Sequence, residues 1–242
     1  MDEYVGTSAA IFQLSVAAAV LVYGILIAKK IPPKFHFVSN LSFAGLLLIV
    51  ASSLGLSFTE AGISFSTLLP GLWVGILASI GILFVAYVLT SLPFLKKYFL
   101  SQHSILRAKP SQIAYETAVR IPFSTALSEE ILFRGVLLGI FLQFYSSLMA
   151  VILSSLLFGL WHVFPTINSI NSEVYLSKAD VSSRLRLLRI SATVATTALA
   201  GVFFAWLRLI SGSIIAPWMA HWTINSSGVL TVLFVRSREG RK

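Results

Sequence analysis

Two adjacent glutamates, Glu129 and Glu130, lie inside one of the most apolar segments of the chain. An ionisable side chain in a membrane span is costly unless it is paired or faces a water-filled cavity, so it is a functional candidate. Adjacent helical residues point about 100° apart, so the two carboxylates cannot face one spot. Glu130 precedes Arg134 by four residues, the favourable order for an ion pair. The spacing predicts that Arg134 neutralises Glu130 and leaves Glu129 for general-base chemistry, although a cluster that only fixes helix packing is the alternative.

Two further polar pairs occur at helical spacing in apolar segments. Phe158 and His162 are four residues apart, and an imidazole serves as base, proton shuttle or metal ligand. The alternative is an interfacial His beside Trp161 in an aromatic belt. His221 and Asn225 are also four apart and could donate two hydrogen bonds to one oxygen, as in an oxyanion site. Hydrogen bonding between helices is the alternative for that pair.

The composition places these residues in a membrane protein. The chain has 242 residues, of which 57% are hydrophobic and 11% are charged, whereas a soluble domain carries about 25% charged residues. We expect an all-α, polytopic transmembrane helical bundle of about seven to eight spans, since a span needs about 20 apolar residues. The spans expected are 8–28, 38–56, 68–91, 113–141, 146–163, 186–207 and 212–235. The absence of Cys excludes disulfides, thiolate metal sites and a cysteine nucleophile.

The net charge of +9 reflects basic residues between the apolar runs. A basic cluster follows each odd-numbered span, and the last cluster ends the chain. In chain order the clusters are Lys29, Lys30 and Lys34; Lys96, Lys97, Arg107 and Lys109; Lys178, Arg184, Arg186 and Arg189; and Arg236, Arg238, Arg241 and Lys242. The positive-inside rule then predicts an external N-terminus and a cytoplasmic C-terminus. The expected location is a prokaryotic plasma membrane, with the lipid bilayer as a partner and no nucleic acid.

Three local features of the chain lead to further expectations. Pro122 is expected to end an interfacial helix before the fourth span proper. Residues 164–184 read as a polar loop, and 186–207 as one tilted span or two shorter helices. The expected organisation is N-terminal helices with a basic cytoplasmic linker over 1–110, a catalytic core over 111–235 and a basic tail over 236–242.

Taken together, these motifs resemble those of a known family. Glu129-Glu130-x-x-x-Arg134, then Phe158-x-x-x-His162, then His221-x-x-x-Asn225 are similar to the CPBP intramembrane proteases. That family includes the type II CAAX prenyl endopeptidases and the bacterial Abi and bacteriocin-immunity proteins. The resemblance covers about residues 111–233, whereas the first three spans are only generically compatible.

The resemblance implies a glutamate-dependent intramembrane endopeptidase acting on a peptide or protein substrate, in prenylated or unmodified form. Glu129 would activate water with help from His162, and His221 and Asn225 would form the oxyanion hole. Glu130, Arg134 and Phe158 would support the site.

We expect a mechanism without a cofactor. In the alternative, Glu129, His162 and His221 would hold Zn, although the HExxH spacing typical of zinc peptidases is absent. Two other functions stay open at this stage: a membrane protein that binds a partner without catalysis, as in immunity to a bacteriocin, and a proton-coupled transporter. The absence of an inverted repeat disfavours the transporter.

Overall fold

The computed structural model describes residues 2–92, 109–177 and 180–239, and all regular structure in these residues is helical. The elements are α1 (Asp2–Lys29), η1 (Pro33–Phe35), α2 (His36–Ser53), η2 (Phe65–Thr67), α3 (Leu68–Ser91), α6 (Pro110–Tyr115), η3 (Glu116–Leu127), α7 (Ser128–Glu130), η4 (Ile131–Leu137), α8 (Leu138–Phe144), α9 (Ser147–Trp161), α10 (Val163–Ser177), α11 (Ser183–Ser211) and α12 (Ile215–Glu239). This composition confirms the all-α class.

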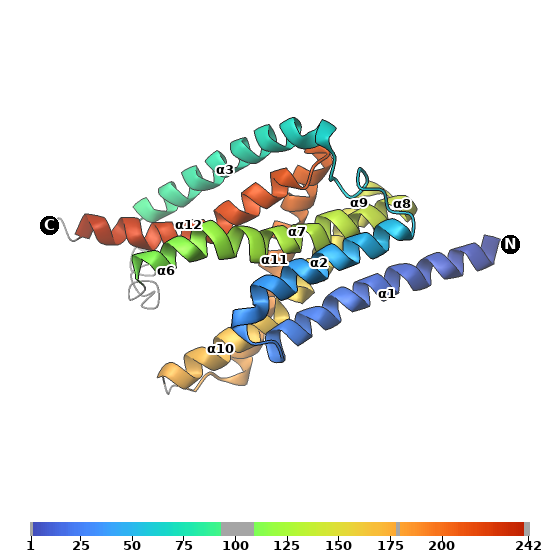
Figure 1. The fold of residues 1–242 in the computed structure, drawn as a ribbon. Helices are drawn as coiled ribbons and strands as arrows, with labels where there is room; N and C mark the ends of the chain where they lie inside the picture. Colours follow the sequence, from blue (N-terminus) through green and yellow to red (C-terminus); the bar gives the residue numbers. More distant parts are fainter. Residues whose placement is uncertain (1, 93–108, 178–179, 240–242) are drawn as a thin grey trace.

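Helices α1, α2, α3 and α12 and the run from α6 to α8 lie side by side in roughly one direction, whereas α11 crosses behind them (Figure 1). The two ends of the chain are at opposite ends of the bundle (Figure 1). Among the described residues, five helical stretches are long and apolar enough to cross a membrane: 10–29, 33–53, 65–89, 147–177 and 183–211. The run from α6 to α8 and helix α12 lie alongside these five (Figure 1). The protein is therefore an integral membrane protein, and its helices agree with the expected number of spans.

The run from α6 to α8 forms the axis of the bundle. Residues 132–141 of this run are all buried, with zero exposure at Phe133, Val136, Leu137 and Ile140. Helices α2, α9 and α12 pack against it. The side chains of this buried stretch therefore meet other helices rather than lipid, which makes it the part of the run on which polar groups can be satisfied.

The expectation that Pro122 interrupts this run was wrong. The helix continues from Pro110 to Phe144 because residues 116–127 form π-helical turns, and residues 131–137 do so again. In an α-helix the proline ring clashes with the carbonyl four residues earlier. A π turn, bonded from residue i to i+5, is wider and leaves the ring more room.

The expectation of a loop over 164–184 was also wrong for most of its length. Helix α10 covers Val163–Ser177 and packs on α1, which is distant in sequence, and on α11, which follows it in the chain. Asn168 Nδ2 donates to the Ala28 carbonyl of α1 at 2.7 Å, and Arg189 of α11 pairs with Glu173 at 2.6 Å. The polar side chains that suggested a loop thus form the hydrogen bond and the ion pair that attach α10 to α1 and α11.

Basic residues gather at one end of the bundle, where α1 ends and α6 and α11 begin (Figure 1). Lys29, Lys30, Lys109 and Arg184 belong to this group. Most of the expected basic linker (93–108), Lys178 and residues 240–242 lie outside the described residues, as do the side chains of 236–239. That this end is cytoplasmic stays a prediction of the positive-inside rule.

The opposite end is closed by the connection between α2 and η2, which Arg208 holds. The Arg208 side chain is 6% exposed and donates to the Glu60 carbonyl at 2.8 Å. The Glu60 carboxylate accepts from Ser57 Oγ and N at 2.6 and 2.8 Å and from Gln143 Nε2 at 3.1 Å. These hydrogen bonds, that of the Ser57 hydroxyl first, hold the pKa of Glu60 below its usual value.

We predict that Gly62→Ala destabilises the protein. Gly62 has φ +74°, and a Cβ there would lie 2.1 Å from Arg208 Nε, so the substitution adds a steric clash to backbone strain of roughly 1–3 kcal/mol. The midpoint of thermal unfolding in detergent measures the effect. Gly45→Ala is the control, because no atom lies within 4 Å of its Cβ and its midpoint should stay or rise. Equal midpoints for the two variants would contradict this account of the connection.

Candidate active site

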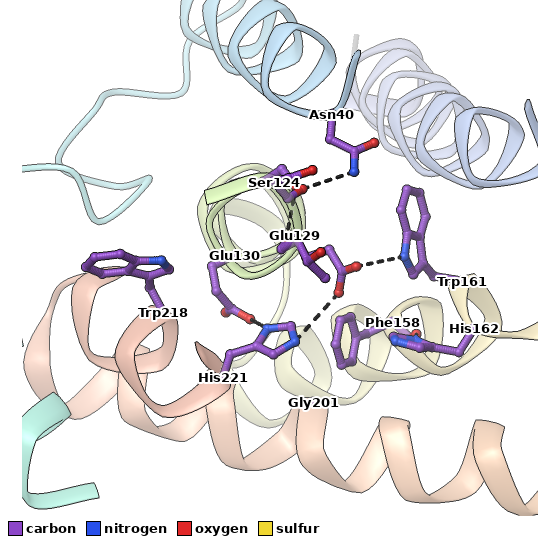
Figure 2. Close-up of polar contacts among 12 residues, drawn as sticks. Asn40, Ser124, Glu129, Glu130, Phe158, Trp161, His162, Gly201, Trp218 and His221 are labelled. Atoms are coloured by element: carbon purple, nitrogen blue, oxygen red, sulfur yellow. Dashed lines mark hydrogen bonds and ion pairs between the residues drawn. The ribbon is translucent and has the colours of Figure 1, made fainter. Parts of the chain in front are cut away.

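The centre of the bundle holds an ion pair between two side chains of the same helix. Arg134 Nε lies 3.3 Å from Glu130 Oε2, and the two residues are 1% and 0% exposed. The pair predicted from the i, i+4 spacing is therefore present. His221 of α12 completes it, since its Nδ1 lies 2.8 Å from Glu130 Oε1 (Figure 2). With the carboxylate as acceptor, Nδ1 carries the proton and donates.

Aromatic rings and one carbonyl enclose the Arg134 guanidinium. Its central carbon lies 4.3 Å from the Phe158 ring centroid and 5.1 Å from that of Phe204. Its Nη2 donates to the Gly201 carbonyl of α11 at 3.2 Å. Phe204 also stacks on the His221 ring, with centroids 4.8 Å apart. Phe158 thus packs against this cluster, and so does Phe204, which the sequence did not indicate because its immediate neighbours are apolar.

Glu129 lies beside this cluster and is 7% exposed. Its Oε1 accepts a hydrogen bond of 3.3 Å from Trp161 Nε1, and its Oε2 lies 3.9 Å from His221 Nε2 (Figure 2). Among the described residues, Oε2 has no hydrogen-bond donor. The two carboxylates do point in different directions, yet one imidazole lies between them. His221 is therefore the residue that links Glu129 to the Glu130–Arg134 pair.

Trp161 is a second residue whose place the sequence did not indicate. It was considered only as an aromatic-belt residue beside His162, but it is 7% exposed and its indole meets the Glu129 carboxylate. Its ring packs on Tyr23 and Phe133, with centroids 6.2 and 5.7 Å away. The available signal was its spacing of three from Phe158, which puts both residues on one side of α9.

A cavity of about 520 Å³ reaches Glu129 from the basic end of the bundle. Its wall combines the end of α1, the connection to α2, and residues of α2, η3, α9 and α10. Trp161, Asn40 and Thr125 line it near Glu129, and Lys29 and Lys30 belong to its wall at the end of α1. The described arrangement therefore gives one buried carboxylate access to a space large enough for a short stretch of peptide.

The backbone just before Glu129 is held by the first half of the chain. Asn40 Nδ2 donates to the Ser124 carbonyl at 3.0 Å, and Tyr23 Oη donates to Asn40 Oδ1 at 2.9 Å (Figure 2 shows the Asn40 contact). Ser128 Oγ donates to the same carbonyl at 2.6 Å. Neither Asn40 nor Tyr23 belongs to a recognisable motif, so the sequence offered no signal for them.

Two of the expected site residues are not joined to Glu129. His162 ends α9, and its Nδ1 is 2.8 Å from the Phe158 carbonyl. Phe158 contacts both imidazoles, with centroids 4.7 Å from His162 and 5.8 Å from His221, and is drawn between them in Figure 2. Asn225 lies one turn beyond His221 and is half-buried, and its amide has no hydrogen bond to another described residue.

The zinc alternative requires Glu129, His162 and His221 to meet at one point. In the part of the chain that the structure describes, no three His, Asp or Glu side chains are grouped as metal ligands. Only Glu129 and His221 Nε2 approach each other, whereas a catalytic zinc takes three protein ligands. The described residues do not fit the ion in this arrangement, and we derive no step through it.

The fold and site define a polytopic membrane protein with a buried Glu–Glu–Arg–His cluster beside a cavity. Residues 112–227, which carry the whole cluster, match the family model described as "Type II CAAX prenyl endopeptidase Rce1-like". This match supports the family resemblance seen in the motifs. No curated protein and no solved structure matches the chain.

We predict that Arg134→Met lowers the free energy of unfolding by about 3–5 kcal/mol, because Glu130 is left as a buried charge without its cation. Arg120→Met is a matched control on the same helical run, since Arg120 pairs with Glu116 four residues away but both are exposed. That pair should be worth at most about 1 kcal/mol. Chemical unfolding in detergent compares the two, and similar losses would show that burial of the Glu130–Arg134 pair is not decisive.

Proposed function

We propose that this protein is an intramembrane endopeptidase in which Glu129 activates the attacking water. The observation that carries the proposal is the position of Glu129, whose carboxylate is almost buried yet lines the cavity, beside the His221–Glu130–Arg134 cluster. The match of residues 112–227 to the prenyl endopeptidase family model supports the same reaction.

In the proposed reaction, a peptide enters the cavity and its scissile carbonyl stops beside Glu129. Glu129 accepts a proton from water as the water oxygen attacks the carbonyl carbon, and then delivers that proton to the leaving amine. General acid–base catalysis of this kind contributes typically 10²–10⁴-fold to the rate. Trp161 Nε1 holds Glu129 Oε1 in place during these transfers.

His221 is proposed to balance the charge of the site. Arg134 offsets one of the two carboxylates, and a proton on His221 would offset the other. With Nδ1 held by Glu130, Nε2 is directed toward Glu129 and would stabilise its carboxylate before it accepts the proton of water.

We keep two finer assignments as proposals. His221 and Asn225 would donate to the oxyanion, because they share a face of α12 and the Asn225 amide is uncommitted among the described residues. His162 would assist Glu129 through Nε2, because Nδ1 serves the Phe158 carbonyl. Neither His162, His221 nor Asn225 lines the cavity among the described residues, so substrate entry would have to open the site toward them.

The proposed substrate is a peptide or protein that reaches Glu129 from the basic end of the bundle. The cavity wall is mainly apolar near α1, with Ile27, Ile31 and Trp161, and is positively charged where Lys29 and Lys30 end the helix. A fluorogenic peptide supplied in farnesylated and unmodified forms tests whether the substrate must carry a lipid, since the two forms differ only in the lipid.

We predict that Glu129→Ala and Glu129→Gln abolish turnover of this reporter by the purified protein, because neither side chain can accept the proton of water at neutral pH. The expected loss is at least 10²-fold in kcat. Glu116→Gln, an exposed change on the same helical run, should keep wild-type kcat. Wild-type turnover by both Glu129 variants would disprove the mechanism. If the wild-type protein cuts no reporter, and the Glu129→Ala variant replaces the wild type in cells that lack the protein, a binding protein without catalysis is the correct interpretation.

We predict that a metal chelator leaves cleavage unchanged, because the proposed reaction uses protein side chains alone. The measurement compares kcat before and after incubation with 1,10-phenanthroline and dialysis. A loss that returns when Zn²⁺ is added back would contradict the proposal and would favour a site that includes Glu129 and His221.

A further inference from the structure

The π-helical segment before the site contains a gap in its backbone hydrogen bonds. In a π turn, the N–H of residue i+5 donates to the carbonyl of residue i. Residue 122 is a proline and has no N–H, so in this register the carbonyl of Thr117 lacks its donor. An unpaired backbone carbonyl away from water costs free energy comparable to a lost hydrogen bond.

A side chain of another helix supplies that donor. Trp222 Nε1 of α12 donates to the Thr117 carbonyl at 2.7 Å. One turn earlier, Trp218 Nε1 donates to the Pro122 carbonyl, also at 2.7 Å. The two indoles stack, with centroids 6.0 Å apart and planes at 22°. The indole of Trp222 thus stands in for the amide that Pro122 cannot provide.

This contact lies close to the proposed site along both helices. Trp222 is adjacent to His221, and Glu129 and Glu130 follow the π-helical segment with no break in the helix. Whether this segment is bonded i to i+5 or i to i+4 decides how far the following residues are rotated about the helix axis. The register therefore determines whether Glu130 reaches His221 Nδ1 and Glu129 faces Nε2.

We propose that Trp222 is a positioning residue that, by replacing the missing amide of Pro122, holds the π-helical register in which Glu129 and Glu130 meet His221. The indole touches neither the cavity nor the two carboxylates in the described structure, so it acts through the helix. Its effect on catalysis rests on the proposed function, whereas its effect on the helix does not.

The test is a double-mutant cycle of Trp222→Phe and Pro122→Ala, read in two ways. Trp222→Phe keeps an aromatic ring but removes the donor, and should lower kcat by on the order of tenfold or more with little change in KM, since small misplacements of a reacting group are costly. The thermal midpoint in detergent should fall as well. Pro122→Ala restores an N–H at residue 122, so in that background Trp222→Phe should cost much less in both kcat and midpoint.

Trp206→Phe is the control, because Trp206 is half exposed on α11 and its indole has no hydrogen bond to a described residue. It should match the wild type. Equal losses from Trp222→Phe in both backgrounds would show that the indole acts only by packing and would overturn the inference, as would a Trp222→Phe variant with wild-type kcat and midpoint. If the wild type cuts no reporter but the midpoints show the rescue, the proposed function fails and the assignment of Trp222 stands.

Discussion

The structure depends on keeping two carboxylates inside an apolar bundle. Glu130 is completely buried and is tolerated because Arg134 and His221 meet it from two sides. Arg134 is in turn enclosed by Phe158, Phe204 and the Gly201 carbonyl. Removing a partner from such a cluster is far more costly than breaking a surface pair. The cluster therefore fixes how α9, α11 and α12 pack around the axial helix, and Glu129 takes its position from that packing.

The second constraint concerns the backbone. Carbonyls freed by Pro122 and by the π turns cannot turn to water inside the bundle, so other helices must satisfy them. Trp218 and Trp222 do so from α12, and Asn40 does so from α2. Because these contacts surround the turn before Glu129, the residues that satisfy the backbone also orient the proposed base. Stability and the geometry of the site are thus coupled through one stretch of helix.

The expectations from the sequence succeeded where the signal was local and failed where a partner was distant. The i, i+4 spacing of Glu130 and Arg134 was enough to predict their pair, since both lie on one helix. Pro122 was expected to interrupt its helix, because a rule based on local sequence takes no account of the π turns and the indole donors that accommodate the proline. Residues 163–177 were read mostly as a loop, because their polar side chains gave no sign of the helices α1 and α11 that they contact.

The sequence by itself determined that this is an all-helical membrane protein with a prenyl endopeptidase-like second half, and it singled out Glu129 through the pairing of its neighbour. Only the tertiary structure decided that His221 lies between the two carboxylates, that Trp161 binds Glu129, and that a cavity leads to it. The physical reason is that a motif defines neighbours along one helix. Contacts between helices depend on the rotation and depth of each helix, which the packing of the whole bundle sets.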